Sequence, residues 1–430
     1  MTASRTQTGS FAIQAARILG LALAFLSTRV LIYLSLRLDS VSFVINDISY
    51  YGAYLFQLIE TGDRSVMAEY PVPAVWILQA IYQFGGGWET WTPWYMWTFL
   101  VLDLLVAVSL YRRRNAWACL FWILFTGAQG AIVWARIDLV PAALVAWACM
   151  LVMTHPRLAG GFVGLGAAIK LWPALLIGPL LAPDPIRDRL GRRRLFGFII
   201  VGFGLAAASL LTSGWARSAS PITWQGERGL QIESIPATPL MFLRTFTDNP
   251  SWNIDLSEFN ALEILSGQPG VELMLRVSTV LTALSIIMAV YLSYRLIRNL
   301  RTGDPRLAES INLAVLTLIL ATIIANKTLS PQYILWLGGP VAALILLRSS
   351  HWLRRHVNVL AVSLLLVAGM TQFTYPWGAF GIMAIPNGAG PETSVLILRN
   401  IALILLTGYT FWLTMAASRR EGDTLSAPIG

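Results

Sequence analysis

The chain has 430 residues, of which 56% are hydrophobic and only 12% are charged. Because about a quarter of the residues in a soluble domain are charged, this composition excludes a water-soluble enzyme and indicates an integral membrane protein. The net charge is +9, but the basic residues gather in short segments between apolar runs, as the positive-inside rule requires. The charge therefore does not indicate a nucleic-acid partner.

Apolar runs recur from residue 11 to residue 417. The expected fold is all-α, a single polytopic transmembrane domain over residues 1–430. The first run is interrupted by Arg17 and Arg29 and lacks a small-residue cleavage site, so it is interpreted as a spanning helix and not as a signal peptide.

Arginine-rich segments set the expected topology. Clusters at residues 112–114, 187–194, 295–306, 348–355 and 419–420 are assigned to the cytoplasmic side of the plasma membrane. About twelve spans keep every cluster on that side. The expected spans are 11–36, 94–111, 116–134, 139–153, 158–170, 172–184, 195–212, 271–294, 308–325, 331–348, 357–376 and 393–417.

Two assumptions support this count. Residues 71–83 are too few for the ~20 that cross a bilayer, so we expect them to form a helix along the outer surface. Residues 158–170 and 172–184 are expected to be two short spans hinged at Trp172-Pro173. The alternative is one span over 158–182, which would bury Lys170 at the midplane at a cost of about 2.5 to 3.5 kcal/mol.

The outer, extracytoplasmic side then carries two large loops, residues 37–93 and 213–270. Five polar clusters at the ends of apolar runs fall on this side, and ionisable groups near membrane depth usually mark a working site. The clusters are Asn46-Asp47, Arg136 to Asp138, Lys170 to Pro173, Arg228 to Glu233, and Asn326 to Gln332. Tryptophans in the two loops are typical of an interfacial belt, and they also offer flat faces to sugar rings.

Asp47 is the candidate general base. It opens a segment in which Tyr50 and Tyr51 follow about one helical turn later, and a carboxylate with one dry side suits proton abstraction. Asn46 and the two tyrosines are candidate substrate contacts. The alternative is an ordinary helix cap, because Asn and Asp accept hydrogen bonds from free backbone N–H groups. Glu69, in the same loop, is expected to be solvated.

Lys170, Lys327 and Arg136 are candidate phosphate ligands. Each lies at the end of an apolar run, and a phosphate is met by lysine as a point charge and by arginine through two contacts. Asp138 has two interpretations that stay open, a local ion pair with Arg136 or a substrate contact, and Trp172 is a further candidate contact.

Two more segments are rich in hydrogen-bonding side chains. One contains Asn326, Gln332 and Tyr333, and the other contains Arg228, Gln231 and Glu233. Both are candidate substrate sites, with a plain polar turn and a solvated loop as the respective alternatives.

Arg29 and Asp103 lie within expected spans and need partners. A mutual ion pair is one solution, and an anionic lipid at Arg29 is another. The sequence contains no phosphate loop, dinucleotide fingerprint, metal-ligand spacing or nucleophile elbow, so no cofactor and no metal are expected.

Taken together, these segments resemble the GT-C glycosyltransferases, and specifically glycosyltransferase family 87, the polyprenol-phosphate-mannose-dependent mannosyltransferases. The resemblance rests on the early Asp47, on Glu69-Tyr70-Pro71-Val72-Pro73, on Arg136-Ile137-Asp138 and on the glycine-rich run from Gly160 to Pro173. It covers residues 11–345, and the last two helices look generic.

The segment from Asn326 to Trp336 also resembles the catalytic mannosyltransferase of GPI-anchor synthesis. That enzyme has Asp-x-Asp in its early loop, whereas this chain has Asp47-Ile48-Ser49 and lacks the second carboxylate. The resemblance implies an inverting displacement on the extracytoplasmic side, from a polyprenyl-phosphate sugar donor to a lipid-linked glycan acceptor, with membrane lipid around it. Asp47 would be the base. A secondary transporter and a lipid or glycan flippase are the rival interpretations.

Overall fold

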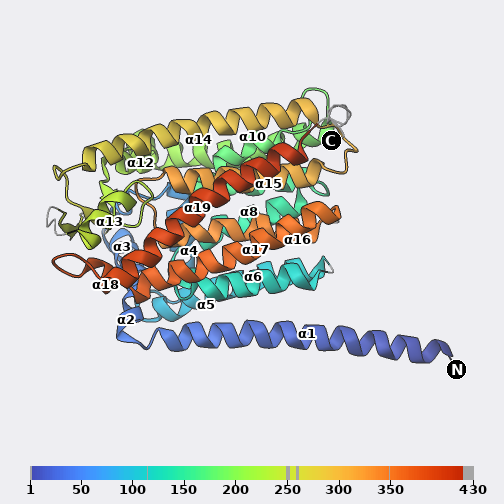
Figure 1. Cartoon of the computed structure of the whole chain (residues 1–430), viewed down its shortest axis with the longest axis horizontal. Coiled ribbons are helices and arrows are strands. Elements are labelled where there is room, and N and C mark those ends of the chain that lie inside the picture. The colour runs from blue at the N-terminus through green and yellow to red at the C-terminus, as the bar shows by residue number, and fades with distance from the viewer. Residues whose placement is uncertain (1, 114, 248–251, 258–260, 348, 420–430) are drawn as a thin grey trace.

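The computed structural model describes residues 2–113, 115–247, 252–257, 261–347 and 349–419. Figure 1 shows a bundle whose long helices run in nearly the same direction. Seven helices within the described residues are long and apolar enough to cross a membrane. They are Ile13–Ser35, Trp88–Arg112, Arg189–Glu227, Val271–Asn299, Leu307–Ala325, His351–Trp377 and Gly390–Ala417. The predicted all-α polytopic membrane fold is thus confirmed.

The helices form as follows along the chain. The long elements are α1 (Thr2–Ser35), α5 (Trp91–Arg112), α12 (Gly204–Glu227), α14 (Val271–Asn299), α15 (Leu307–Ala325), α17 (His351–Gln372) and α19 (Gly390–Ala417). The shorter ones are α2 (Asp39–Ser42), α3 (Asn46–Thr61), α4 (Val72–Phe84), α6 (Ala116–Gln129), α7 (Ile132–Ala135), α8 (Leu139–Leu151), α9 (Pro156–Ile169), α10 (Ile177–Leu180), α11 (Arg189–Phe198), α13 (Thr238–Phe246), α16 (Gly338–Leu346) and α18 (Ala379–Met383). Short 3-10 turns cover Phe43–Ile45, Trp88–Thr90, Trp172–Leu176 and Pro331–Leu337, and π-helical turns cover Ile199–Phe203 and Phe373–Trp377.

Several expected spans are shorter or broken. The span expected at 116–134 stops at Gly130, which has a φ of 71°, a left-handed conformation that glycine adopts without steric cost. The span expected at 172–184 is not one helix, because it contains only the turn Trp172–Leu176 and the four-residue α10. Prolines at 173, 179 and 183 remove backbone donors there. The chain still reverses after α9, since Gly166 of α9 lies against Pro173.

The segment expected to lie along the outer surface is α4. It is a helix as expected, and Ala74, Val75 and Leu78 on one side of it are buried. It contacts α5, α9 and α12. Packing against the bundle therefore contributes to its place in addition to any contact with the membrane surface.

The second large loop expected from the sequence contains helices and a small sheet. The helix expected to end at residue 212 continues to Glu227 through a kink at Gly214. The segment that follows folds into α13 and a small antiparallel sheet of order β1 (Leu230–Gln231), β3 (Leu262–Ile264), β2 (Ile254–Leu256). A small apolar core holds this unit on the bundle, with Leu230, Met241 and Ile264 packed near Leu396 of α19.

One end of the bundle holds the start of α1, the end of α19 and the described arginine-rich segments (Figure 1). Arg295 donates to Ser418 at 3.0 Å, and Arg306 donates to the carbonyl of Arg419 at 2.9 Å. We call this the arginine-rich end. Arg114, Arg348 and Arg420, which the sequence assigns to the same side, lie outside the described residues.

Buried charges hold the spans together. Arg29 of α1 pairs with Asp103 of α5 at 2.6 Å, with exposed fractions of 4% and 0%, so the first of the two solutions considered for these charges, a mutual ion pair, is present. Close contact between helix backbones also holds the spans together. A Cβ added at Gly160 of α9 would collide with the backbone of Arg194 in α11, and small residues at such positions let two backbones approach.

Candidate active site

A cavity of about 490 Å³ opens at the end of the bundle opposite the arginine-rich end. Figure 1 shows α3 and α18, which contribute to its walls, at that end. It brings together segments separated by more than 300 positions in the chain. The predicted site residues that line it are Asn46, Asp47, Tyr50, Arg136, Lys170, Arg228, Gln231, Glu233, Gln332 and Tyr333.

Asp47 and Arg136 form an ion pair at the cavity wall. An Asp47 carboxylate oxygen accepts from the Arg136 guanidinium at 2.5 Å, and the side chains are 7% and 20% exposed. Asp47 does not cap its helix, because no side chain caps the first turn of α3. Burial raises the pKa of Asp47 above its ordinary value, and the charge of Arg136 partly opposes that rise. Asp47 belongs to none of the spanning helices.

Lys170 pairs with Asp138, whereas Arg136 pairs with Asp47. Its ammonium donates to both carboxylate oxygens of Asp138, at 2.7 and 2.9 Å. The local ion pair between Arg136 and Asp138, one of the two interpretations left open by the sequence, is therefore wrong. Each of the two side chains binds a residue from another segment. Lys170 remains 21% exposed and faces the cavity, whereas Asp138 is fully buried behind it.

A stack of aromatic rings lies next to the Lys170 side chain. Tyr333 stacks on Trp336 at 4.2 Å between ring centroids, and Trp336 stacks on Trp172 at 4.5 Å. The ammonium of Lys170 lies 5.0 Å from the Tyr333 ring centroid, within the range of a cation–π contact. Trp336 also donates to Asp138 at 3.0 Å. Trp172, proposed from the sequence as a substrate contact, is thus a buried member of the stack and does not line the cavity.

Glu69 is a site residue that the sequence argument placed in solvent. It lines the cavity and accepts a hydrogen bond from the Tyr50 hydroxyl at 2.5 Å. Burial raises the pKa of Glu69, while the bond from Tyr50 lowers it. The next residue of α3, Tyr51, is buried, does not line the cavity and shares a hydrogen bond of 2.8 Å with Tyr70. The signal that marks these positions was the Glu69-Tyr70-Pro71 run itself, an acid beside a helix start.

The second loop contributes Glu233 to the cavity wall, and a buried arginine of α19 binds Glu233. Arg399 donates to a Glu233 carboxylate oxygen at 2.6 Å, and neither side chain is more than 6% exposed. Asn400 donates to the carbonyl of Glu233 at 3.2 Å. The last two helices are therefore not generic. A lone arginine in an apolar run carried the signal, but nothing in the sequence names its partner.

Lys327 and Asn326 do not line the cavity. The Lys327 ammonium donates to the carbonyl of Gly226 at 2.9 Å, and burial lowers the pKa of Lys327. The side-chain oxygen Oδ1 of Asn326 accepts hydrogen bonds from the backbone N–H and the hydroxyl of Thr328. These contacts make the plain polar turn the better description of residues 326–330, because both side chains bind neighbouring chain segments.

Arg228 stays at the cavity edge. Its Nε lies 3.9 Å from a carboxylate oxygen of Glu263, a residue of β3. Aromatic side chains complete the walls, among them Tyr54, Tyr70, Trp224 and Tyr375. Flat rings of this kind suit the apolar faces of a sugar.

In the parts of the chain that the structure describes, no group of three or more His, Cys, Asp or Glu side chains is placed to hold a metal ion. The ionisable groups at the cavity are instead paired acids and bases. Such a set can accept a proton at a carboxylate and stabilise a developing anion at a cation.

Comparison with protein families shows that the model of glycosyltransferase family 87 matches residues 69–322. The matched region contains Glu69, Arg136, Lys170 and Glu233 and begins after Asp47. No curated protein matches the chain.

Proposed function

Because the chain belongs to glycosyltransferase family 87, we propose that it transfers mannose or another hexose from a polyprenyl-phosphate donor to a lipid-linked glycan. The chain is a membrane glycosyltransferase, as its family and its seven long apolar helices show. The family match gives no support to the transporter and flippase interpretations. The donor, the acceptor and the roles of single residues are our proposal.

The observation that carries the proposal is one cavity that holds a buried carboxylate beside two partly exposed cations. Asp47 takes the proton of an acceptor hydroxyl while that oxygen attacks the anomeric carbon of the donor. The bond from the anomeric carbon to the phosphate oxygen breaks, and the phosphate leaves with the bonding electrons. This single displacement inverts the anomeric configuration.

Lys170 and Arg136 stabilise the leaving phosphate. Each side chain is about a fifth exposed, and each is oriented by a carboxylate, so little reorganisation is needed as negative charge develops. Asp138, although buried, acts through Lys170 as a positioning residue. Asn46, Tyr50, Gln231 and Gln332 offer hydrogen bonds to sugar hydroxyls.

The place of the cavity supports the side of the reaction. It lies opposite the arginine-rich end, and basic segments favour the cytoplasmic side. The reaction is therefore assigned to the extracytoplasmic side of the plasma membrane. A lipid-linked donor suits that side, since its apolar tail can remain in the bilayer while the sugar enters the cavity.

The test is direct. Purified protein is incubated with radiolabelled polyprenyl-phosphate mannose and a panel of envelope lipids, and labelled lipid products are separated. We expect transfer to at least one lipid, lost in Asp47→Asn and kept in Asp39→Asn, an exposed acid of the same outer segment. Transfer from a nucleotide sugar but not from the lipid donor would overturn the donor assignment. Full transfer by Asp47→Asn would remove Asp47 as the base.

A further inference from the structure

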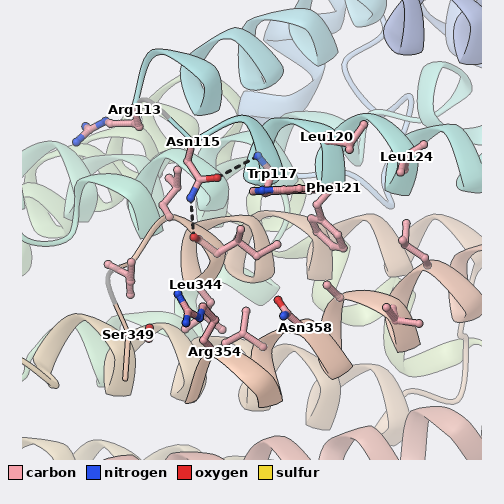
Figure 2. A pocket seen from close by; sticks show the side chains of 17 residues that line it. Arg113, Asn115, Trp117, Leu120, Phe121, Leu124, Leu344, Ser349, Arg354 and Asn358 are labelled. Atoms are coloured by element: carbon pink, nitrogen blue, oxygen red, sulfur yellow. Dashed lines mark hydrogen bonds between the residues drawn. The ribbon is translucent and has the colours of Figure 1, made fainter. Parts of the chain in front are cut away.

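A second, larger cavity lies near the arginine-rich end, between α6 and α17 (Figure 2). Its volume is about 1020 Å³, about twice that of the candidate active site. Asn115, Trp117 and Phe121 form one wall, and Arg354 and Asn358 face them from α17. The end of α16 closes the floor, where Asn115 donates to the carbonyl of Ile345 at 2.8 Å. We call this cavity the arginine groove.

The apolar walls of the arginine groove open toward lipid. Trp117 is 74% exposed, and Val362 is 59% exposed. Both belong to apolar helices, and the helix of Val362 is one of the seven candidate spans. Exposed apolar side chains on a spanning helix face acyl chains, so the groove is a hollow in the lipid-facing surface.

The polar part of the groove carries charge of a single sign. Arg113 and Arg354 lie at its rim and wall, and no carboxylate is found among the described residues that line it. The Arg354 guanidinium lies 2.7 Å from the imidazole Nδ1 of His351, on the same helix. Arg354 and Asn358, four residues apart on one face of α17, offer hydrogen-bond donors to an anion. Figure 2 shows the Arg113 side chain at the rim, directed away from them.

The length of the groove matches one leaflet. It runs along α17 from Arg354 to Leu365, a rise of ~16 Å at 1.5 Å per residue. The hydrocarbon core of a bilayer is ~30 Å thick, so the groove covers about half of it. A two-chain lipid of one leaflet fits this length, whereas a polyprenyl chain is much longer.

We propose that the arginine groove binds an anionic phospholipid of the leaflet at the arginine-rich end. The headgroup phosphate binds Arg354 and Asn358, Arg113 adds positive charge at the rim, and the acyl chains lie against Trp117, Leu124 and Val362. This site is separate from the candidate active site and does not depend on the proposed reaction.

The test measures thermal unfolding of the purified, delipidated full chain in detergent. Phosphatidylglycerol, phosphatidylcholine with the same acyl chains, inorganic phosphate and polyprenyl phosphate are added separately. We expect phosphatidylglycerol alone to raise Tm, by about 4 °C near saturation. Native mass spectrometry should show one retained phosphatidylglycerol per chain.

The double variant Arg113→Gln, Arg354→Gln should lose both effects. The matched control, Arg192→Gln with Arg193→Gln, changes two exposed arginines outside the groove and should keep them. A third variant, Ala361→Trp, fills the groove without changing charge and should lose the effects too, which covers the case of a double variant that fails to fold.

Four outcomes would overturn the proposal. An equal shift with phosphatidylcholine would remove headgroup recognition. A shift with inorganic phosphate alone would reduce the site to an ion site. A shift with polyprenyl phosphate only would change the occupant. A loss in the Arg192 and Arg193 control would assign the effect to general surface charge.

Discussion

Two arginine–aspartate pairs in this protein are alike in chemistry and different in surroundings. Arg29 donates to Asp103 through Nε and Nη2, at 3.0 and 2.6 Å, and also to the carbonyl of Ile123 at 2.8 Å. Trp122 donates to the other Asp103 oxygen at 2.8 Å. By contrast, the Arg136–Asp47 pair has one contact at 2.5 Å, and the Nε of Arg136 has no hydrogen-bond partner among the described residues.

The two pairs differ in whether their arginine can still bind a further ligand. The donors of Arg29 are directed at α5, at α6 and at Thr28 of its own helix, and the pair is almost fully buried, so it can only hold the bundle together. Arg136 is 20% exposed and lines a cavity, so it can bind a further anion without losing its first partner. A buried ion pair is weak evidence for function by itself. An incompletely bonded pair on a cavity wall is stronger evidence.

The largest expected effect is a loss of sugar-transfer activity when the Arg136–Asp47 pair is changed. Asp47→Asn removes the proposed base, and kcat for sugar transfer should fall by about 10³-fold. The amide is nearly isosteric, so the thermal unfolding temperature should change little. Radiolabelled transfer and thermal unfolding of the same preparation measure both quantities. A variant that keeps activity but loses stability would make Asp47 structural, like Asp103.

This contrast also shows how far the sequence could be interpreted. Composition and arginine placement predict the polytopic fold, and the ends of apolar runs predict a shared site, because both follow from the cost of charge in a bilayer. Asp47, Arg136 and Lys170 do line one cavity. The pair Arg29–Asp103 was predictable for the same reason, since each charge sits alone in a span.

Partner choice could not be predicted in the same way. Arg136 and Asp138 are two positions apart, but each pairs with a residue from another segment, because backbone turns and not sequence spacing set side-chain direction. Arg399 pairs with Glu233 across 166 positions. Lys327 points to Gly226 for the same reason. Polar clusters in the sequence thus indicate where a site forms, and only tertiary packing decides which side chains enter it.

The next effect is on stability. Asp103→Asn leaves the charge of Arg29 buried without a counter-charge, which should reduce the free energy of unfolding by about 3 kcal/mol. The measurement is thermal or denaturant unfolding in detergent. Transfer per folded molecule should stay unchanged, with Asp39→Asn as the exposed control. A strong activity loss in folded Asp103→Asn would contradict the structural role of this pair.

Lys170→Ala should lower kcat by about 10²-fold, because it removes one preorganised cation at the leaving phosphate. Lys170→Arg keeps the charge near Asp138 and should recover part of the rate. Initial rates at varied donor and varied acceptor concentrations distinguish the roles. A defect confined to the KM of the acceptor would exclude Lys170 as a phosphate ligand.

The pH dependence follows from the pKa of Asp47. The base works only when ionised, and burial raises its pKa above the ordinary 3.8 while Arg136 opposes the rise. Activity should therefore fall as pH decreases, about tenfold per unit below the raised pKa, starting at a higher pH than for an exposed aspartate. The profile of kcat/KM measures this limb. Glu69→Gln should leave the limb in place, and a limb that disappears in that variant would assign the base to Glu69.

The smallest effect is expected at Lys327. Lys327→Ala removes an ammonium that binds the carbonyl of Gly226 outside the cavity, so kcat and the KM of the donor should change by no more than about twofold, as for most surface substitutions. The backbone link is untouched, since the carbonyl of Lys327 still accepts from the N–H of Gln231 at 3.0 Å. The donor titration used for Lys170→Ala serves as the comparison. A tenfold rise in donor KM would show that Lys327 reaches the phosphate, and would return it to the site that the sequence first suggested.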